Sequence, residues 1–168
     1  MSREAAVLVM IGVAVLFLVL MLLAWRRRQK RDSALSAPIG VPEHAEVRER
    51  QEVLYVATTR HEQPLERLAL KPLTYRARGE ASITDRGLAL SLDGAPTVFL
   101  ASDLLVRVEQ STWTIDRVVE PGGLVRITWL AGDDTPVDSY LRLVAGDTTD
   151  FIRSLAPLCQ APQTGASA

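Results

Sequence analysis

Cysteine, asparagine and histidine are scarce in this chain of 168 residues. Cys159 is the only cysteine, so no disulfide forms within the chain, as in proteins of reducing compartments. Asparagine is absent, which excludes an N-glycosylation sequon. The histidines are His44 and His61; His61-Glu62 opens like a zinc-protease motif, but position 65 is leucine, so the second ligand is missing. We therefore expect neither a disulfide scaffold nor a metal centre.

Motifs for nucleotides and hard cations are missing too. The chain contains neither GxGxxG nor GxxxxGK[ST], so nothing supports nucleotide binding. Two acidic groups, Asp133-Asp134 with Asp138 and Asp147 with Asp150, lack the spacing of a calcium loop, and we interpret them as solvated turn carboxylates. Because no pattern indicates a catalytic, cofactor or metal site, we expect that the protein is not an enzyme and carries no cofactor.

The near-neutral net charge of −1 conceals an uneven distribution. Residues 1–31 contain six basic side chains and one acidic one, a balance of +5. Residues 32–168 contain 13 basic and 19 acidic side chains, a balance of −6. An acidic folded part argues against nucleic acid as a partner, because phosphates require a basic face. It also argues against a domain that lies flat on anionic lipid.

One long apolar run, residues 5–25, dominates the first part of the chain. Its 21 residues contain no charge, amide or proline, and as a helix they would measure roughly 31 Å, the thickness of the bilayer core. The run is longer than a signal-peptide core, and a basic cluster stands where a cleavage site would be expected. Gly12 has leucine, not glycine, four residues later, so no helix-dimer motif is present. We predict a single uncleaved transmembrane helix that acts as a tether.

The residues that flank this span predict its orientation. Only Arg3 and Glu4 are charged before it, whereas five basic residues follow it: Arg26, Arg27, Arg28, Lys30 and Arg31. Positive charges near the end of a span stay in the cytoplasm. We therefore expect a single-pass protein of the cell (inner) membrane, with residues 1–4 outside and the domain in the cytoplasm. The same five residues are also candidates for contact with anionic lipid headgroups.

Residues 26–52 have the composition of a basic juxtamembrane cluster followed by a linker. The stretch 32–41 is small and polar, with Pro38 and Gly40, and Pro42 follows it. Residues 43–52 are strongly charged, and their composition is compatible with a short solvated helix or with irregular structure.

Residues 53–158 change to short apolar runs with a period of two, separated by turn residues, which is typical of a small sandwich or barrel. Asp147 and Thr148 can cap a final helix whose apolar face contains Phe151, Ile152 and Leu155. Residues 159–168 have the composition of a disordered tail. We expect Trp113, Trp129, Tyr140 and Phe151 in the core. About seven strands are predicted, from runs at 53–58, 73–78, 88–92, 97–101, 104–108, 124–130 and 137–144. The period-two alternation is also present at 80–84, before a tight turn at 85–87.

The stretch 79–94, GEASITDRGLALSLDG, resembles a strand–turn–strand signature of bacterial PH-like and GRAM-like domains. The order of elements in residues 124–155 is consistent with the rest of such a domain. The whole chain is similar to small single-pass actinobacterial membrane proteins with a pleckstrin-homology-like (PH-like) domain. The resemblance implies a mainly-β domain of about seven antiparallel strands, a small barrel or sandwich, capped by one C-terminal helix. It brings no catalytic or binding residue to carry over.

The function that this resemblance implies is a membrane-anchored cytoplasmic interaction or scaffold module without catalysis, whose partner is a protein at or near the membrane. One alternative is the binding of anionic lipid headgroups; another is an accessory role in a transport or export complex. Because Glu62 and Glu66 dilute the basic residues of the first hairpin, a solvated face of mixed charge is the simpler interpretation of that region. The residues that would form a headgroup-binding face are Arg60, Arg67, Lys71, Arg76 and Arg78.

Overall fold

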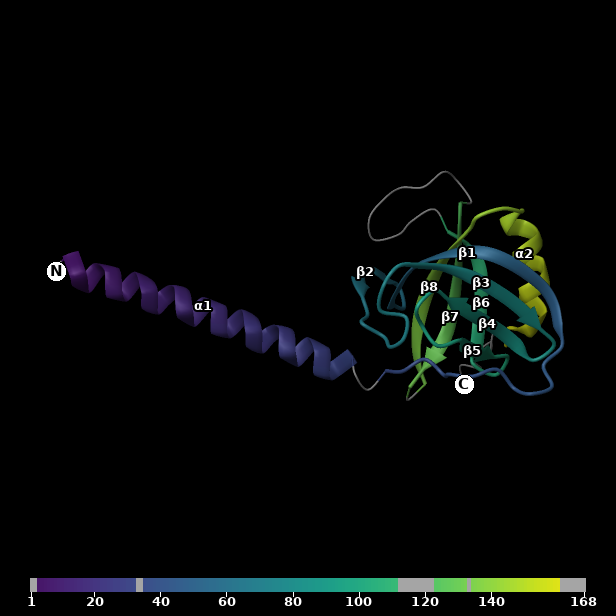
Figure 1. Ribbon diagram of the computed structural model, residues 1–168, viewed down its shortest axis with the longest axis horizontal. Helices are drawn as coiled ribbons and strands as arrows, with labels where there is room; N and C mark the ends of the chain where they lie inside the picture. The colour runs from purple at the N-terminus through teal and green to yellow at the C-terminus, as the bar shows by residue number, and fades with distance from the viewer. Residues whose placement is uncertain (1–2, 33–34, 112–122, 133, 161–168) are drawn as a thin grey trace, which may run out of the picture. The chain divides into compact units, whose positions relative to one another are not determined.

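The computed structural model describes residues 3–32, 35–111, 123–132 and 134–160 (Figure 1). The chain forms two compact units, Met1–Ala34 and Leu35–Ala168.

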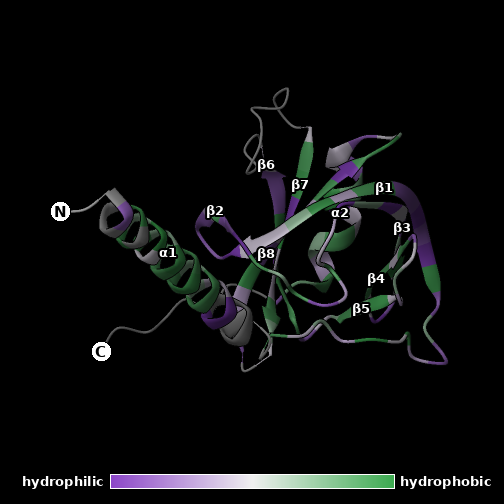
Figure 2. Ribbon diagram, turned by 60° about the vertical axis from the view of Figure 1, so that its left-hand side comes forward, coloured by the Kyte–Doolittle hydropathy of each residue, from purple (hydrophilic) through white to green (hydrophobic). Residues whose placement is uncertain are grey.

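The first unit consists of the helix α1, Arg3–Asp32. Within it, Val9–Arg27 is long and apolar enough to cross a membrane. Its described apolar side chains have no protein cover; Phe17, for example, is 68% exposed. Figure 2 shows hydrophobic colour along the middle of α1 and hydrophilic colour toward both ends. The helix continues beyond residue 25 and includes the basic cluster, which was predicted to begin the juxtamembrane segment 26–52.

The second unit is built on one antiparallel sheet. The strand order is β5-β4-β3-β1-β8-β7-β6, and β2 pairs only with β1. The predicted mainly-β architecture with a C-terminal helix is confirmed. No pairing joins β5 to β6 within the residues described, so the sheet is not a closed barrel. The elements are β1 (Val47–Arg60), β2 (Gln63–Arg67), β3 (Ala77–Thr84), β4 (Gly87–Leu92), β5 (Val98–Ala101), β6 (Leu105–Ser111), β7 (Leu124–Ala131), β8 (Thr135–Leu143), α2 (Thr148–Leu155) and the short 3-10 helix η1 (Ala156–Leu158).

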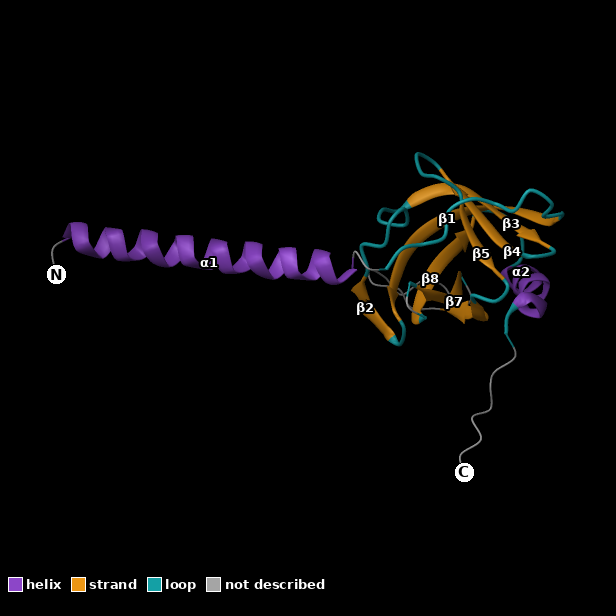
Figure 3. Ribbon diagram, turned by 90° about the horizontal axis from the view of Figure 1, so that it is seen from below, coloured by secondary structure: helices purple, strands orange, loops and turns teal. Residues whose placement is uncertain are grey.

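The core lies between the inner faces of the sheet and α2. Helix α2 packs on β6 and β7 and buries Phe151 and Leu155 completely. Figure 3 shows α2 at the side of the strands of the domain. Trp129 is also fully buried in the core, as the sequence predicted. Tyr140 is 2% exposed, but it is buried on the outer face of β8 and is not part of the core cluster. Trp113 and most of the predicted tail lie outside the described residues.

A chain of four hydrogen bonds runs through this core, and its direction follows from chemistry. The Trp129 indole can only donate, and it donates to Ser139 Oγ at 2.9 Å. At the other end, the Tyr55 hydroxyl donates to the carbonyl of Leu73 at 2.8 Å. Between them lie contacts of 2.7 Å from Ser139 to Thr58 and 2.9 Å from Thr58 to Tyr55. Each hydroxyl has one proton, so Ser139 donates to Thr58, and Thr58 donates to Tyr55.

Two strand predictions differ from the structure, and one strand was not predicted. The strand predicted at 53–58 begins at Val47 in the structure. The mostly charged residues 47–52 pair with β3 through their backbone, and their side chains are exposed or half-buried. The segment 73–78 is mostly a turn: Leu73 is buried, and β3 begins only at Ala77. Strand β2 was not predicted because it contains Pro64, which lacks an N–H; a strand that pairs on one side only tolerates this.

The expected linker also differs from the structure in its second part. Ala37 is 4% exposed, and its N–H donates to the carbonyl of Lys71 at 3.1 Å. Ile39 forms an antiparallel bridge with Val98 on the outer side of β5. Residues 35–41 therefore pack on the domain and cover one edge of the sheet, because their backbone groups find partners there.

Candidate functional site

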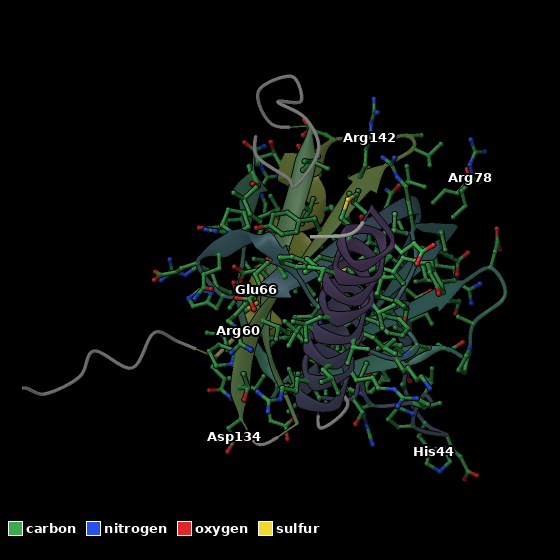
Figure 4. All side chains as sticks on the ribbon, turned by 90° about the vertical axis from the view of Figure 1, so that its left-hand side faces the viewer. His44, Arg60, Glu66, Arg78, Asp134 and Arg142 are labelled. Carbon is green, nitrogen blue, oxygen red and sulfur yellow. The ribbon has the colours of Figure 1, made fainter. Side chains whose placement is uncertain are left out.

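The predicted headgroup-binding face is divided by the fold. Arg60 lies 3.5 Å from Glu66, and Arg67 donates to the carbonyl of Thr74 at 3.1 Å, so both guanidinium groups have partners at the β1–β2 hairpin. Figure 4 shows Arg60 and Glu66 together.

Arg78 lies elsewhere. It stands opposite Leu54 of β1, and Arg142 stands opposite Leu54 on the other side. Figure 4 shows Arg78 and Arg142 on one side of the domain, away from Arg60. Lys71 and Arg76 are exposed and make no ion pair with any residue that the structure describes. The five basic residues thus occupy three different environments.

The basic residues that follow the span belong to the last turns of α1. Arg26 and Arg27 are exposed on the helix. Arg28, Lys30 and Arg31 are helical in the backbone, and their side chains are outside the described set.

The most concentrated polar cluster is centred on Asp138 of β8. The interpretation of Asp138 as a solvated turn carboxylate was wrong, because this residue lies within a strand and is buried. The Asp138 side chain is 1% exposed. Thr128 of β7 donates to its Oδ1 at 2.7 Å, and the backbone N–H of Glu62 donates to its Oδ2 at 3.3 Å. His61 Nδ1 lies 3.0 Å from Oδ1, and because an ionised carboxylate only accepts, Nδ1 carries the proton. The β1–β2 turn is therefore fastened to β8.

The cluster extends outward through Arg126. Its Nη1 lies 4.0 Å from Asp138 Oδ2, and its other terminal nitrogen pairs with Glu109 of β6. Glu109, Arg126 and Tyr140 stand in register across β6, β7 and β8. A buried carboxylate is costly unless it is paired and hydrogen-bonded, and these partners meet that requirement for Asp138.

The geometry of this cluster supports a structural role. A carboxylate that orients an imidazole is one part of a catalytic triad, but no described hydroxyl or thiol is hydrogen-bonded to His61. Cys159 is half-buried and contacts the carbonyl of Leu155, and burial raises the pKa of its thiol, which disfavours a nucleophilic thiolate. Within the described ranges, no group of His, Cys, Asp and Glu side chains could hold a metal ion.

One signal for the Asp138 cluster is present in the sequence. Asp138, Tyr140 and Arg142 lie at alternate positions of β8, so they share the outer face, opposite to Val137, Leu141 and Leu143. The pairing with His61, 77 positions earlier, depends on the long-range pairing of β1 with β8.

Comparison with known proteins identifies the family to which the chain belongs. No curated protein and no solved structure matches the chain. The model of the bacterial PH domain-like family matches residues 33–155, which is well over half of the chain and includes all eight described strands and α2. The chain therefore belongs to the bacterial PH domain-like family.

Proposed function

We propose that this protein is a membrane-tethered interaction module: α1 crosses the cell membrane, and the PH-like domain recruits a protein partner on the cytoplasmic side without catalysis. The observation that carries this proposal is the order of parts, because an apolar helix of spanning length is followed directly by the matched domain. The resemblance to single-pass actinobacterial proteins supports the same reading. A tether raises the effective concentration of the domain for other membrane proteins.

The edge of β6 is the best position for a partner segment to add as a strand. Residues 38–40 cover the edge of β5, and β2 is short and contains Pro64. Beyond Leu105, which accepts from the backbone of Gln160, no described strand pairs with the outer edge of β6. An exposed strand edge is a template for β-augmentation by an extended peptide.

Site-specific photo-crosslinking in intact cells tests this function. A photoreactive residue at Arg107 on β6 is expected to give a discrete adduct in the membrane fraction, and mass spectrometry of that adduct identifies the partner. A photoreactive residue at Ser154, exposed on α2, is the matched control. Equal labelling at both positions would contradict docking at β6, and recovery of the protein in the soluble fraction would contradict the tether.

Headgroup binding is a second candidate function, favoured by one observation. Lys71 and Arg76 are exposed, and neither makes an ion pair in the described part of the chain. Co-sedimentation of the separate domain, residues 35–168, with anionic liposomes at low and high salt tests it, because headgroup binding is expected to weaken with salt. An accessory role in a transport or export complex is compatible with the first proposal, and the crosslinked adduct would then contain a multi-span protein.

A further inference from the structure

Two large apolar side chains of the domain are unusually exposed. Tyr75 is 80% exposed and Leu65 is 74% exposed, the highest values for a large apolar residue in the described part of Leu35–Ala168. Most exposed apolar side chains on a protein surface are isolated and require no explanation. The exposure of Tyr75 and Leu65 requires an explanation if the two side chains belong to the same surface.

A contact in the fold brings their two segments together. Leu65 lies two residues before Arg67 in β2, a strand whose pairing with β1 is irregular between Gln63 and Arg67. The Arg67 guanidinium donates to the carbonyl of Thr74, the residue immediately before Tyr75. Leu65 and Tyr75 are thus linked through Arg67.

The loop that carries Tyr75 is anchored to the core of the domain. Leu68, Leu70 and Leu73 are at most 1% exposed, and the Tyr55 hydroxyl holds the carbonyl of Leu73. Because the loop from β2 to β3 is fixed to the core at these points, the exposure of Tyr75 is a property of the folded domain.

Two features indicate what this surface binds: its charge, and the place where the chain that follows α1 joins the domain. Lys71 and Arg76 lie on either side of Tyr75 in the sequence and are exposed, although residues 32–168 as a whole have a charge balance of −6. Lys71 also forms the bridge with Ser36, and Ser36 follows the end of α1 by only four positions. We call Leu65, Lys71, Tyr75 and Arg76 the entry surface, because the incoming chain is bonded to its loop.

We propose that the entry surface rests on the lipid bilayer, with Tyr75 and Leu65 in the interfacial region and Lys71 and Arg76 on anionic headgroups. This inference rests on the proposed anchoring of α1. Tyrosine favours the interface because its ring is apolar and its hydroxyl is polar, and basic side chains are attracted by anionic lipid. The contact involves one small area, so the net acidity of the domain does not oppose it as it would oppose a domain lying flat.

The test uses the full-length protein with Cys159→Ser, reconstituted in vesicles of phosphatidylcholine with or without phosphatidylglycerol. Single cysteines carry an environment-sensitive dye at Tyr75→Cys or Leu65→Cys, so that each variant retains the other apolar side chain. Ser154→Cys is the solvent-exposed control, and Leu16→Cys reports insertion of α1. Quenching by nitroxide-labelled lipid is measured for every site.

We expect strong lipid quenching at positions 16, 65 and 75 in anionic vesicles, and little at position 154. Adding Lys71→Gln and Arg76→Gln to the Leu65→Cys variant is expected to lower the ratio of bilayer-bound to free domains about thirty-fold, because two positive charges are lost. Quenching at position 16 with none at 65 or 75 would overturn this inference and leave the tether intact. Absence of quenching at position 16 would overturn both. A blue shift at 65 or 75 without lipid quenching would indicate a protein occupant and would also overturn the inference.

Discussion

Individual polar residues inside the domain depend on partners that are distant in the chain. Asp138 receives hydrogen bonds from Thr128, from the backbone of Glu62 and from His61. Ser139, the next residue, points to the opposite face of β8 and links Trp129 to Thr58. Two consecutive residues of one strand therefore connect two separate polar networks, one on each face of the sheet.

Replacement of Asp138 tests the first network. Asp138→Asn is expected to lower the free energy of unfolding by about 1–3 kcal/mol, because the amide presents donors to groups that are themselves donors. Urea unfolding in detergent measures the loss, with Asp93→Asn, an exposed aspartate, as the control. Equal stability of the two variants would show that the cluster contributes little.

Removal of the Ser139 hydroxyl tests the second network. Ser139→Ala leaves the buried Trp129 N–H without its acceptor and Thr58 Oγ1 without its donor, at an expected cost of about 1–3 kcal/mol in unfolding free energy. Ser91→Ala is the matched control, because its hydrogen bond to Thr97 is exposed. We expect the control to change stability by less than about 0.5 kcal/mol. An equal effect of both substitutions would contradict the directed chain.

At the scale of elements, the edges of the sheet receive different protection. Residues 38–40 cover β5, Gln160 contacts the start of β6, and Pro64 interrupts donors on β2. Helix α2 closes the core with Phe151 and Leu155, and its first turn is held by Asp147, whose carboxylate accepts from the N–H of Thr149 at 2.7 Å. These local devices let an open sheet stay ordered.

The cap of α2 makes a prediction about pH. The hydrogen bond from the Thr149 backbone holds the pKa of the Asp147 carboxyl below its usual value. A carboxyl with a lowered folded pKa stabilises the protein above its unfolded pKa of about 3.9, and this stabilisation is lost as pH falls through the folded value. Asp147→Ser retains a cap that does not titrate. The difference in stability between the native chain and Asp147→Ser, measured by thermal unfolding, should be constant above about pH 5 and should shrink below about pH 4. A difference that does not change with pH would refute this role of Asp147.

At the scale of the whole molecule, the sequence separates a basic anchor from an acidic domain. The five basic residues that follow the span, against Arg3 alone before it, are the basis of the proposed orientation. The family match begins at residue 33, so the change of charge and the start of the domain nearly coincide.

Neutralising the basic cluster tests the orientation. Changing Arg26, Arg27, Arg28, Lys30 and Arg31 to glutamine should convert a uniform population into a mixed one, because the bias of positive charge is removed. Reporters fused to Ala168, one active only in the cytoplasm and one active only outside, measure the two fractions. Arg48→Gln with Arg50→Gln, both within β1, is the control and should leave the orientation unchanged. Activity of the outside reporter on the unmodified chain would reverse the proposed side.

Local pattern in the sequence determined α1, most of the strands and the capped α2, because burial of one face requires a regular spacing of apolar residues. Only the tertiary structure decided which polar residues meet. It joined His61 to Asp138, separated Arg78 from Arg60, and extended β1 through residues whose charge suggested a helix or a linker. The physical reason is that strand pairing supplies partners from distant segments, so the environment of a polar side chain depends on register and not on its neighbours in sequence.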